Sequence, residues 1–138
     1  MSVYVFDGQG GGIGRALIER LRNTFPNSQI IAVGSNSMAT AAMLKGGANT
    51  GATGENAVVY CCQQAQPTDV IAGPLGIVLA NAMLGEFSPV MARAVAESRA
   101  YKILIPVSRC RASVAGVTEK PLSQYLEDAV ELIRTYLK

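Results

Sequence analysis

Apolar and polar positions alternate along the chain in a way that predicts strands and helices in turn. The apolar run at residues 3–6 predicts a first strand, and residues 15–25 repeat apolar side chains at helical spacing with polar ones between them. Pro26 ends that helix, and residues 29–33 form a β-branched run that Gly34 closes. These segments predict a strand–helix–strand unit with a right-handed crossover.

The remaining pattern continues this alternation. Further helices are expected over residues 38–45, from Thr53 to Gln64, over 77–84, from the cap and proline pair Ser88–Pro89 onward, and over 122–137. Further strands are expected over residues 69–72, 102–107 and 111–117, the last at an edge or antiparallel, and the glycine-rich residues 46–54 are expected to form a mobile loop. No repeat or linker interrupts the pattern. It predicts one α/β domain over residues 1–138, Rossmann-like and three-layered, with a mostly parallel sheet of about five strands.

Composition narrows the classes of partner. The chain has 138 residues, of which 49% are hydrophobic and only 16% charged, so we expect a real core and an apolar surface that self-association would bury, as a homodimer or higher oligomer. The net charge of +2 comes from scattered residues, which argues against nucleic-acid binding. No apolar stretch reaches the roughly 18 residues that cross a bilayer. We therefore expect a cytoplasmic protein that does not contact a membrane.

The most informative segment is Asp-Gly-Gln-Gly-Gly-Gly-Ile-Gly at residues 7–14, between the first strand and the first helix. Glycines let a backbone turn sharply and approach a ligand closely, and the free amides of a helix N-terminus attract phosphate. The segment predicts a phosphate or nucleotide site; its candidate residues are Asp7, Gly8, Gly10, Gly12, Ile13 through its amide, and Gly14. The alternative is that the glycines only permit a tight turn and close packing of helix on sheet. Gly11 has no role in either interpretation.

Two neighbours of this loop bear on the ligand. Asp7 would repel a phosphate unless loop amides or a bridging metal ion occupy its oxygens, so a structural turn and a catalytic or Mg²⁺ role are both open. The second strand ends at Ser35 and Asn36, where NAD sites usually place an acid. Uncharged side chains tolerate a 2′-phosphate better, which favours NADP over NAD. Both residues are alternatively ordinary helix caps.

Other polar residues are weaker candidates. Glu55 and Asn56 follow a second glycine loop, and residues 73–76 with Ser108 and Arg109 should border the same sheet edge, while Asn81 and Glu86 are equally consistent with a polar lining or an interface. The chain has no histidine, so the commonest general base is absent. Cys61, Cys62 and Cys110 are interpreted as packing thiols, since their spacing matches no metal site. Two rival functions stay open: a small enzyme acting on a phosphorylated substrate through Asp7 or Glu55, and a non-catalytic oligomeric regulatory module.

By its spacing, Gly8-x-x-x-Gly12-Ile13-Gly14 resembles the cofactor loop of the short-chain dehydrogenase/reductase family, in which this loop seats the pyrophosphate. The resemblance covers roughly the first 34 residues and then weakens. That family's catalytic Tyr-x-x-x-Lys is missing, because the residues four places after the first four tyrosines are Gly8, Gln64, Ile105 and Ala129. The resemblance therefore implies that the protein binds a nucleotide, NADP or NAD, but does not catalyse that family's reductase reaction.

The whole chain resembles a bacterial family of small proteins known only as a domain of unknown function. The resemblance rests on the segment at residues 7–14 together with Gly51-Ala-Thr-Gly-Glu-Asn56, Gly73-Pro-Leu-Gly76 and Ile105-Pro106. It implies a Rossmann-like fold and a bacterial cytoplasmic setting, and it lends no activity or catalytic residue.

Overall fold

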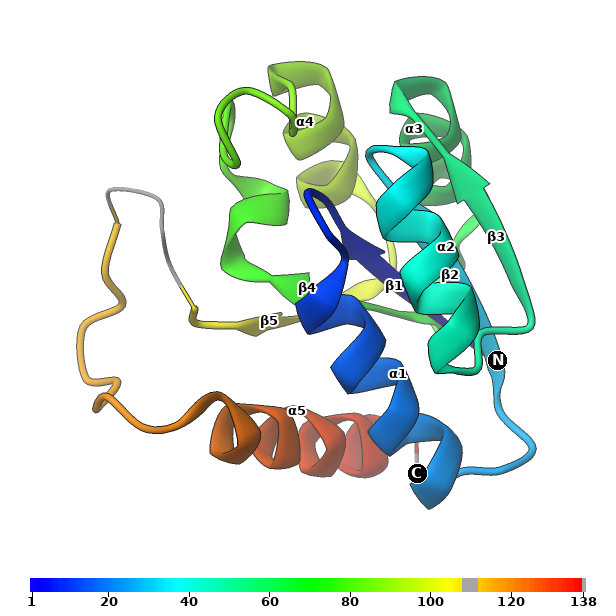
Figure 1. The fold of residues 1–138 in the computed structure, drawn as a ribbon, viewed down its shortest axis with the longest axis vertical. Helices are drawn as coiled ribbons and strands as arrows, with labels where there is room; N and C mark the ends of the chain where they lie inside the picture. Colours follow the sequence, from blue (N-terminus) through cyan, green and yellow to red (C-terminus); the bar gives the residue numbers. More distant parts are fainter. Residues whose placement is uncertain (108–111, 138) are drawn as a thin grey trace.

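A computed structural model describes residues 1–107 and 112–137, which form a three-layer α/β domain (Figure 1). Its central sheet has five strands, all parallel, in the order β3-β2-β1-β4-β5. In chain order the elements are β1 (Ser2–Asp7), α1 (Gly12–Thr24), β2 (Gln29–Gly34), α2 (Ser37–Gly46), β3 (Thr50–Thr53), α3 (Glu55–Gln64), β4 (Val70–Pro74), the 3₁₀ turn η1 (Leu75–Val78), α4 (Pro89–Glu97), β5 (Tyr101–Ile105) and α5 (Leu122–Tyr136). The predicted fold class is confirmed.

Both faces of the sheet are buried, as an all-parallel sheet requires. Alternate residues of β1 point to opposite faces: Val3 and Val5 belong to the core under α1, α2 and α5, whereas Phe6 belongs to the core under α3 and α4. The helices on the two faces fill these cores: Leu17 of α1 is fully buried in one, and Val58 of α3 is fully buried in the other. Because β1 is the middle strand and β2 lies beside it, the N-terminal strand–helix–strand unit occupies the centre of the sheet.

The glycine-rich segment 46–54 is not a free loop, and here the sequence prediction is wrong. Thr50 to Thr53 form the edge strand β3, which pairs in parallel with β2 from Ile31 to Gly34. The pattern did not reveal this strand because an edge strand of four mostly exposed residues has no apolar alternation. The following helix begins after Gly54 rather than after Thr53, whose hydroxyl donates to Thr40 at 2.8 Å instead of capping the helix.

The prediction of a helix over residues 77–84 is also wrong. Only the short η1 turn forms there, after which the backbone of Asn81, Met83 and Leu84 takes left-handed φ angles of 64°, 59° and 57°. Positive φ is incompatible with a right-handed helix, and a short apolar run cannot by its pattern be told from other buried segments. By contrast, the start predicted at Ser88 and Pro89 is confirmed, since the Ser88 hydroxyl accepts the Met91 N–H at 3.2 Å.

The strand expected over residues 111–117 is not present in its described part, residues 112–117, and Arg111 lies outside the described residues. A turn closes here instead, with the Val117 N–H bonded to the Val114 carbonyl at 3.3 Å and Gly116 at a φ of 84°. Val114 and Val117 are 44% and 42% exposed. Their β-branched side chains therefore gain no sheet environment.

Candidate functional site

A cleft opens at the carboxyl edge of the sheet, beside the glycine loop between β1 and α1. The strand order reverses direction between β1 and β4, and such a switch point is where open α/β sheets bind ligands. The cleft has a volume of about 550 Å³. Its walls come from the ends of β1 and β4, the loop at 82–84 and the start of α5, and its lining includes Asp7, Gly8, Gly10, Gly12, Ile13, Pro74, Gly76, Met83, Leu84, Val107 and Leu122.

The glycines of the loop separate into two groups. A side chain added at Gly10 or Gly12 would meet no atom within 4 Å, and neither residue has a positive φ, so the fold itself does not require glycine there. At Gly14 an added Cβ would lie 2.5 Å from the Met43 sulfur, and at Gly11, where φ is 70°, it would lie 2.7 Å from the Ala39 carbonyl oxygen. Gly11 thus has the role that the sequence left unassigned: it lets α1 and α2 approach closely.

Gly10 and Gly12 also have backbone N–H groups without a hydrogen-bond partner among the described residues. No acceptor among residues 1–107 and 112–137 takes the N–H of Gly10 or of Gly12. Both residues are exposed at the cleft. The Gly11 N–H, in contrast, is bonded to the Gly8 carbonyl at 2.9 Å. Two unbonded amides at and just before the start of a helix suit an anionic ligand.

Asp7 lies beneath the loop with 4% of its surface exposed. Its Oδ1 accepts the Gly8 N–H at 2.8 Å and its Oδ2 accepts the Gly14 N–H at 2.7 Å, so the interpretation of Asp7 as an acceptor for loop amides is confirmed. Burial raises the pKa of this carboxyl above its ordinary value, although the N–H groups of Gly14, Gly8 and Ile13 oppose the shift. Gly14 therefore turns its amide toward Asp7 rather than toward the cleft.

Glu86, which the sequence indicated only as a weaker candidate, ties the glycine loop to the end of β2. Its Oε1 accepts the Gln9 N–H at 2.7 Å, the Ser35 hydroxyl at 2.5 Å and the amide nitrogen of Asn36. Desolvation alone would raise the pKa of Glu86, but these hydrogen bonds outweigh it, and the pKa lies below its ordinary value. No local pattern in the sequence connects Glu86 with these three partners, which lie 50 to 77 positions earlier in the chain.

Ser35 and Asn36 lie on the β2 side of the loop and do not line the cleft. Asn36 caps α2, because its Oδ1 accepts the Ala39 N–H at 2.8 Å, so the capping role is confirmed. Its amide nitrogen also donates to the Gln9 carbonyl at 2.9 Å. Both side chains thus hold the second strand, the glycine loop and Glu86 in one network.

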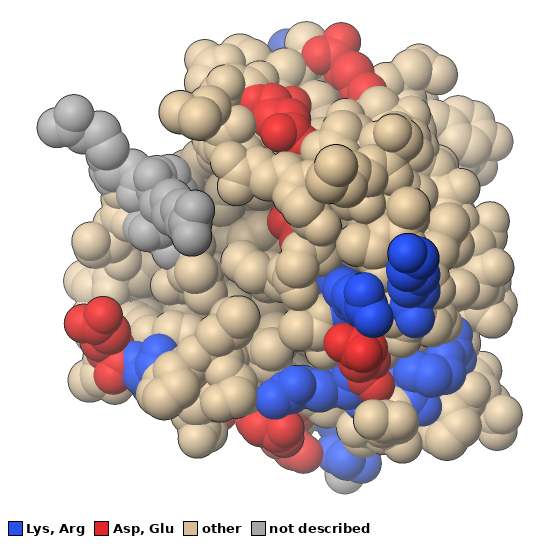
Figure 2. Space-filling view, viewed as in Figure 1, with Lys and Arg blue, Asp and Glu red and all other residues tan. Residues whose placement is uncertain are grey.

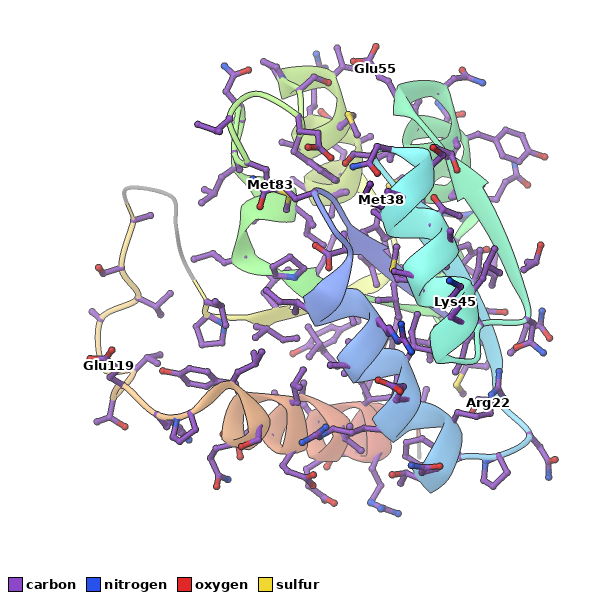
Figure 3. The ribbon with its side chains drawn as sticks, in the orientation of Figure 1. Arg22, Met38, Lys45, Glu55, Met83 and Glu119 are labelled. Atoms are coloured by element: carbon purple, nitrogen blue, oxygen red, sulfur yellow. The ribbon has the colours of Figure 1, made fainter. Side chains whose placement is uncertain are left out.

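The loop that carries Glu86 has an unusual backbone. Asn81, Met83 and Leu84 have left-handed φ angles, and Gly85 has a φ of 86°. A short antiparallel bridge between Ala82 and Phe87 closes this loop, and Met83 lies beside the glycine loop in Figure 3. Positive φ in non-glycine residues is uncommon and is concentrated at functional sites.

The other polar candidates lie elsewhere. Glu55, at the upper edge in Figure 3, accepts the Ser88 hydroxyl at 2.6 Å and does not line the cleft. Cys61 and Cys62 are buried in the core under α3 and α4, and burial raises the pKa of both thiols, that of Cys62 to about 12. Such thiols are unreactive at neutral pH. Ser108, Arg109 and Cys110 lie outside the described residues.

Asp7 is the one charged residue among the described residues that line the cleft. On the face shown in Figure 2, Lys and Arg side chains gather mainly in the lower right part, over α1 and the lower end of α2, whereas acidic side chains are spread from the upper edge to the bottom. In the part of the chain that the structure describes, no cluster of three or more His, Cys, Asp or Glu side chains is placed to hold a metal ion. Within the same residues, no helix is long and apolar enough to span a bilayer.

The fold and the position of its cleft define a Rossmann-like parallel α/β domain. The chain belongs to the family described as domain of unknown function DUF3842, whose model matches residues 2–138. The resemblance to a family of unknown function is thereby confirmed. No curated protein and no solved structure matches this chain.

Proposed function

We propose that this protein binds a phosphate-bearing nucleotide at the carboxyl edge of its sheet, with the phosphate on the N–H groups of Gly10 and Gly12. One observation carries the proposal. At these two glycines the fold would accept a side chain, yet both line the cleft, and each has an N–H that no described residue accepts. Glycine there serves the close approach of a ligand.

The charges around the loop limit how the phosphate is held. Asp7 lies beneath it and Glu86 beside it, and each carboxylate would repel a phosphate. The repulsion from Asp7 is reduced because the N–H groups of Gly8 and Gly14 occupy its two oxygens. The proposal therefore places the phosphate toward the start of α1, where the helix dipole favours an anion.

The size of the cleft and its apolar wall favour a nucleotide over inorganic phosphate. Met83, Leu84, Val107 and Leu122 give the cleft an apolar lining, and a volume of about 550 Å³ lies within the range of small-molecule sites. The proposed ligands are NAD, NADP or a mononucleotide. The proposal assigns binding and no catalysed reaction.

Ligand-induced thermal stabilisation tests this function. NAD, NADP and AMP are each added to wild type, to Gly12→Val and to Asn56→Val, which introduces the same valine side chain in the first turn of α3, outside the cleft. We expect at least one ligand to raise the thermal midpoint of wild type and of Asn56→Val by a few degrees. Gly12→Val should melt near wild type without ligand and lose that rise. No rise for wild type, or an undiminished rise for Gly12→Val, contradicts the proposal.

A further inference from the structure

We propose that Glu86 recognises the ribose of the bound nucleotide and selects a ligand with a free 2′-hydroxyl over one with a 2′-phosphate. This inference rests on the proposed function and names the ligand class of the same site. It replaces the sequence-based preference for NADP with a preference for NAD or an adenosine nucleotide that carries no 2′-phosphate.

The two oxygens of Glu86 are used differently. Oε1 accepts three hydrogen bonds, from Gln9, Ser35 and Asn36, which fix the carboxylate in place. Oε2 accepts none from any residue that the structure describes. Glu86 is half-buried, and its Oε2, held in place by the bonds to Oε1, is an acceptor that stays accessible to a ligand.

Glu86 does not itself line the cleft, but it accepts the N–H of Gln9, which does, so its carboxylate lies beside the cleft on the β2 side of the glycine loop. A carboxylate at the end of the second strand usually accepts hydrogen bonds from the ribose hydroxyls. Here β2 ends at Gly34, followed by the uncharged Ser35 and Asn36, and the acid comes from the loop after η1 instead. Ser35 and Asn36 are the donors that hold this carboxylate, and so they are not free to receive a phosphate.

The Glu86 carboxylate would also disfavour a ligand that carries a 2′-phosphate. A 2′-phosphate would bring about two further negative charges against a carboxylate that three hydrogen bonds keep ionised and in place. Specificity often depends on such a repulsive element as well as on the attractive one. The positive φ angles of Asn81, Met83, Leu84 and Gly85 fit a loop held in one conformation to present this side chain.

The variant Glu86→Gln separates the two oxygens. Its amide oxygen keeps an acceptor for the three donors, while its NH₂ group replaces the free oxygen with a donor of no charge. Glu55→Gln is the matched control, because the Glu55 carboxylate also accepts a serine hydroxyl but lies outside the network of the glycine loop. Affinities for NAD and NADP, and for AMP and adenosine 2′,5′-bisphosphate, are measured by isothermal titration calorimetry.

We expect wild type and Glu55→Gln to prefer the ligand without the 2′-phosphate by about tenfold or more, and Glu86→Gln to reduce the preference to about threefold or less. A ratio of affinities is insensitive to a modest loss of stability. Equal binding of both ligands by wild type, or an unchanged ratio in Glu86→Gln, would overturn this inference while nucleotide binding stands. If wild type binds none of the four ligands, both proposals fail.

Discussion

At the scale of single residues, the buried carboxylate of Asp7 explains why the loop has its shape. It accepts one N–H from the loop and one from the first turn of α1, and so joins the end of β1 to the helix that follows. Its role is to organise the loop. Burial nevertheless disfavours the charged form, which has a consequence for the dependence of stability on pH.

We predict that the Asp7 carboxyl titrates above the ordinary aspartate value of about 3.9. The folded protein then keeps this proton to higher pH than the unfolded chain does. Stability therefore falls as the pH rises from the ordinary value through the raised folded value, and above that window Asp7 contributes no further change. Carboxyl ¹³C NMR titration measures the folded pKa directly. A midpoint at or below the ordinary value would contradict the prediction.

The sequence predicted part of this site residue by residue. Asp7, Gly10 and Gly12 were recognisable because the strand, glycine turn and helix follow one another locally. Gly11 and Glu86 were not. The role of Gly11 depends on the carbonyl of Ala39 in another helix, and that of Glu86 on three donors far away in the chain. Contacts of this kind are set by tertiary packing and leave no local pattern.

At the scale of elements, the packing of α1 against α2 separates structural glycines from open ones. Gly11→Ala places a Cβ against a backbone oxygen at a positive φ, and we predict a loss of roughly 2 kcal/mol or more. Gly10→Ala, at the preceding position of the same loop, should change stability by less than about 0.5 kcal/mol. Urea denaturation compares the two variants with wild type. Equal losses for both would show that the distinction is wrong.

Elements with strong local signals were predictable, and those that depend on their neighbours were not. The apolar spacing of α1 and the Ser88–Pro89 start of α4 specify helices on their own. The edge strand β3 exists because β2 offers it a parallel partner, and its own residues show no alternation. Within residues 77–84, Ile77 and Ala82 are apolar because they pack in the core, and the left-handed φ angles of Asn81, Met83 and Leu84 are incompatible with the helix that the apolar run suggests.

At the scale of the whole molecule, the alternation of strands and helices predicted the fold class, but the strand order with its reversal beside β1 came from the structure. Apolar groups remain on the surface. Leu84 is fully exposed, and Met38, Tyr60 and Val90 are each more than half exposed. Singly exposed apolar residues are common, but together with a charged content of only 16% they leave a surface suited to self-association.

We predict that the protein forms a homodimer or a higher oligomer in solution, since association would bury part of this surface. Light scattering coupled to size-exclusion chromatography measures the mass over a wide concentration range. The expected mass is a multiple of the 14.5 kDa chain. A constant mass of one chain at every concentration would contradict the prediction.

The central claim, that the glycine loop holds the phosphate of a nucleotide, is tested most directly by the amides themselves. In a titration of ¹⁵N-labelled protein with AMP and with NAD, we predict that the amide resonances of Gly10 and Gly12 shift saturably with at least one of the two. Adenosine, which lacks the phosphate, should leave them nearly unmoved. If both glycine resonances stay in place while the ligand binds elsewhere, or if neither nucleotide perturbs the spectrum, the glycine loop is not a phosphate site and the claim is wrong.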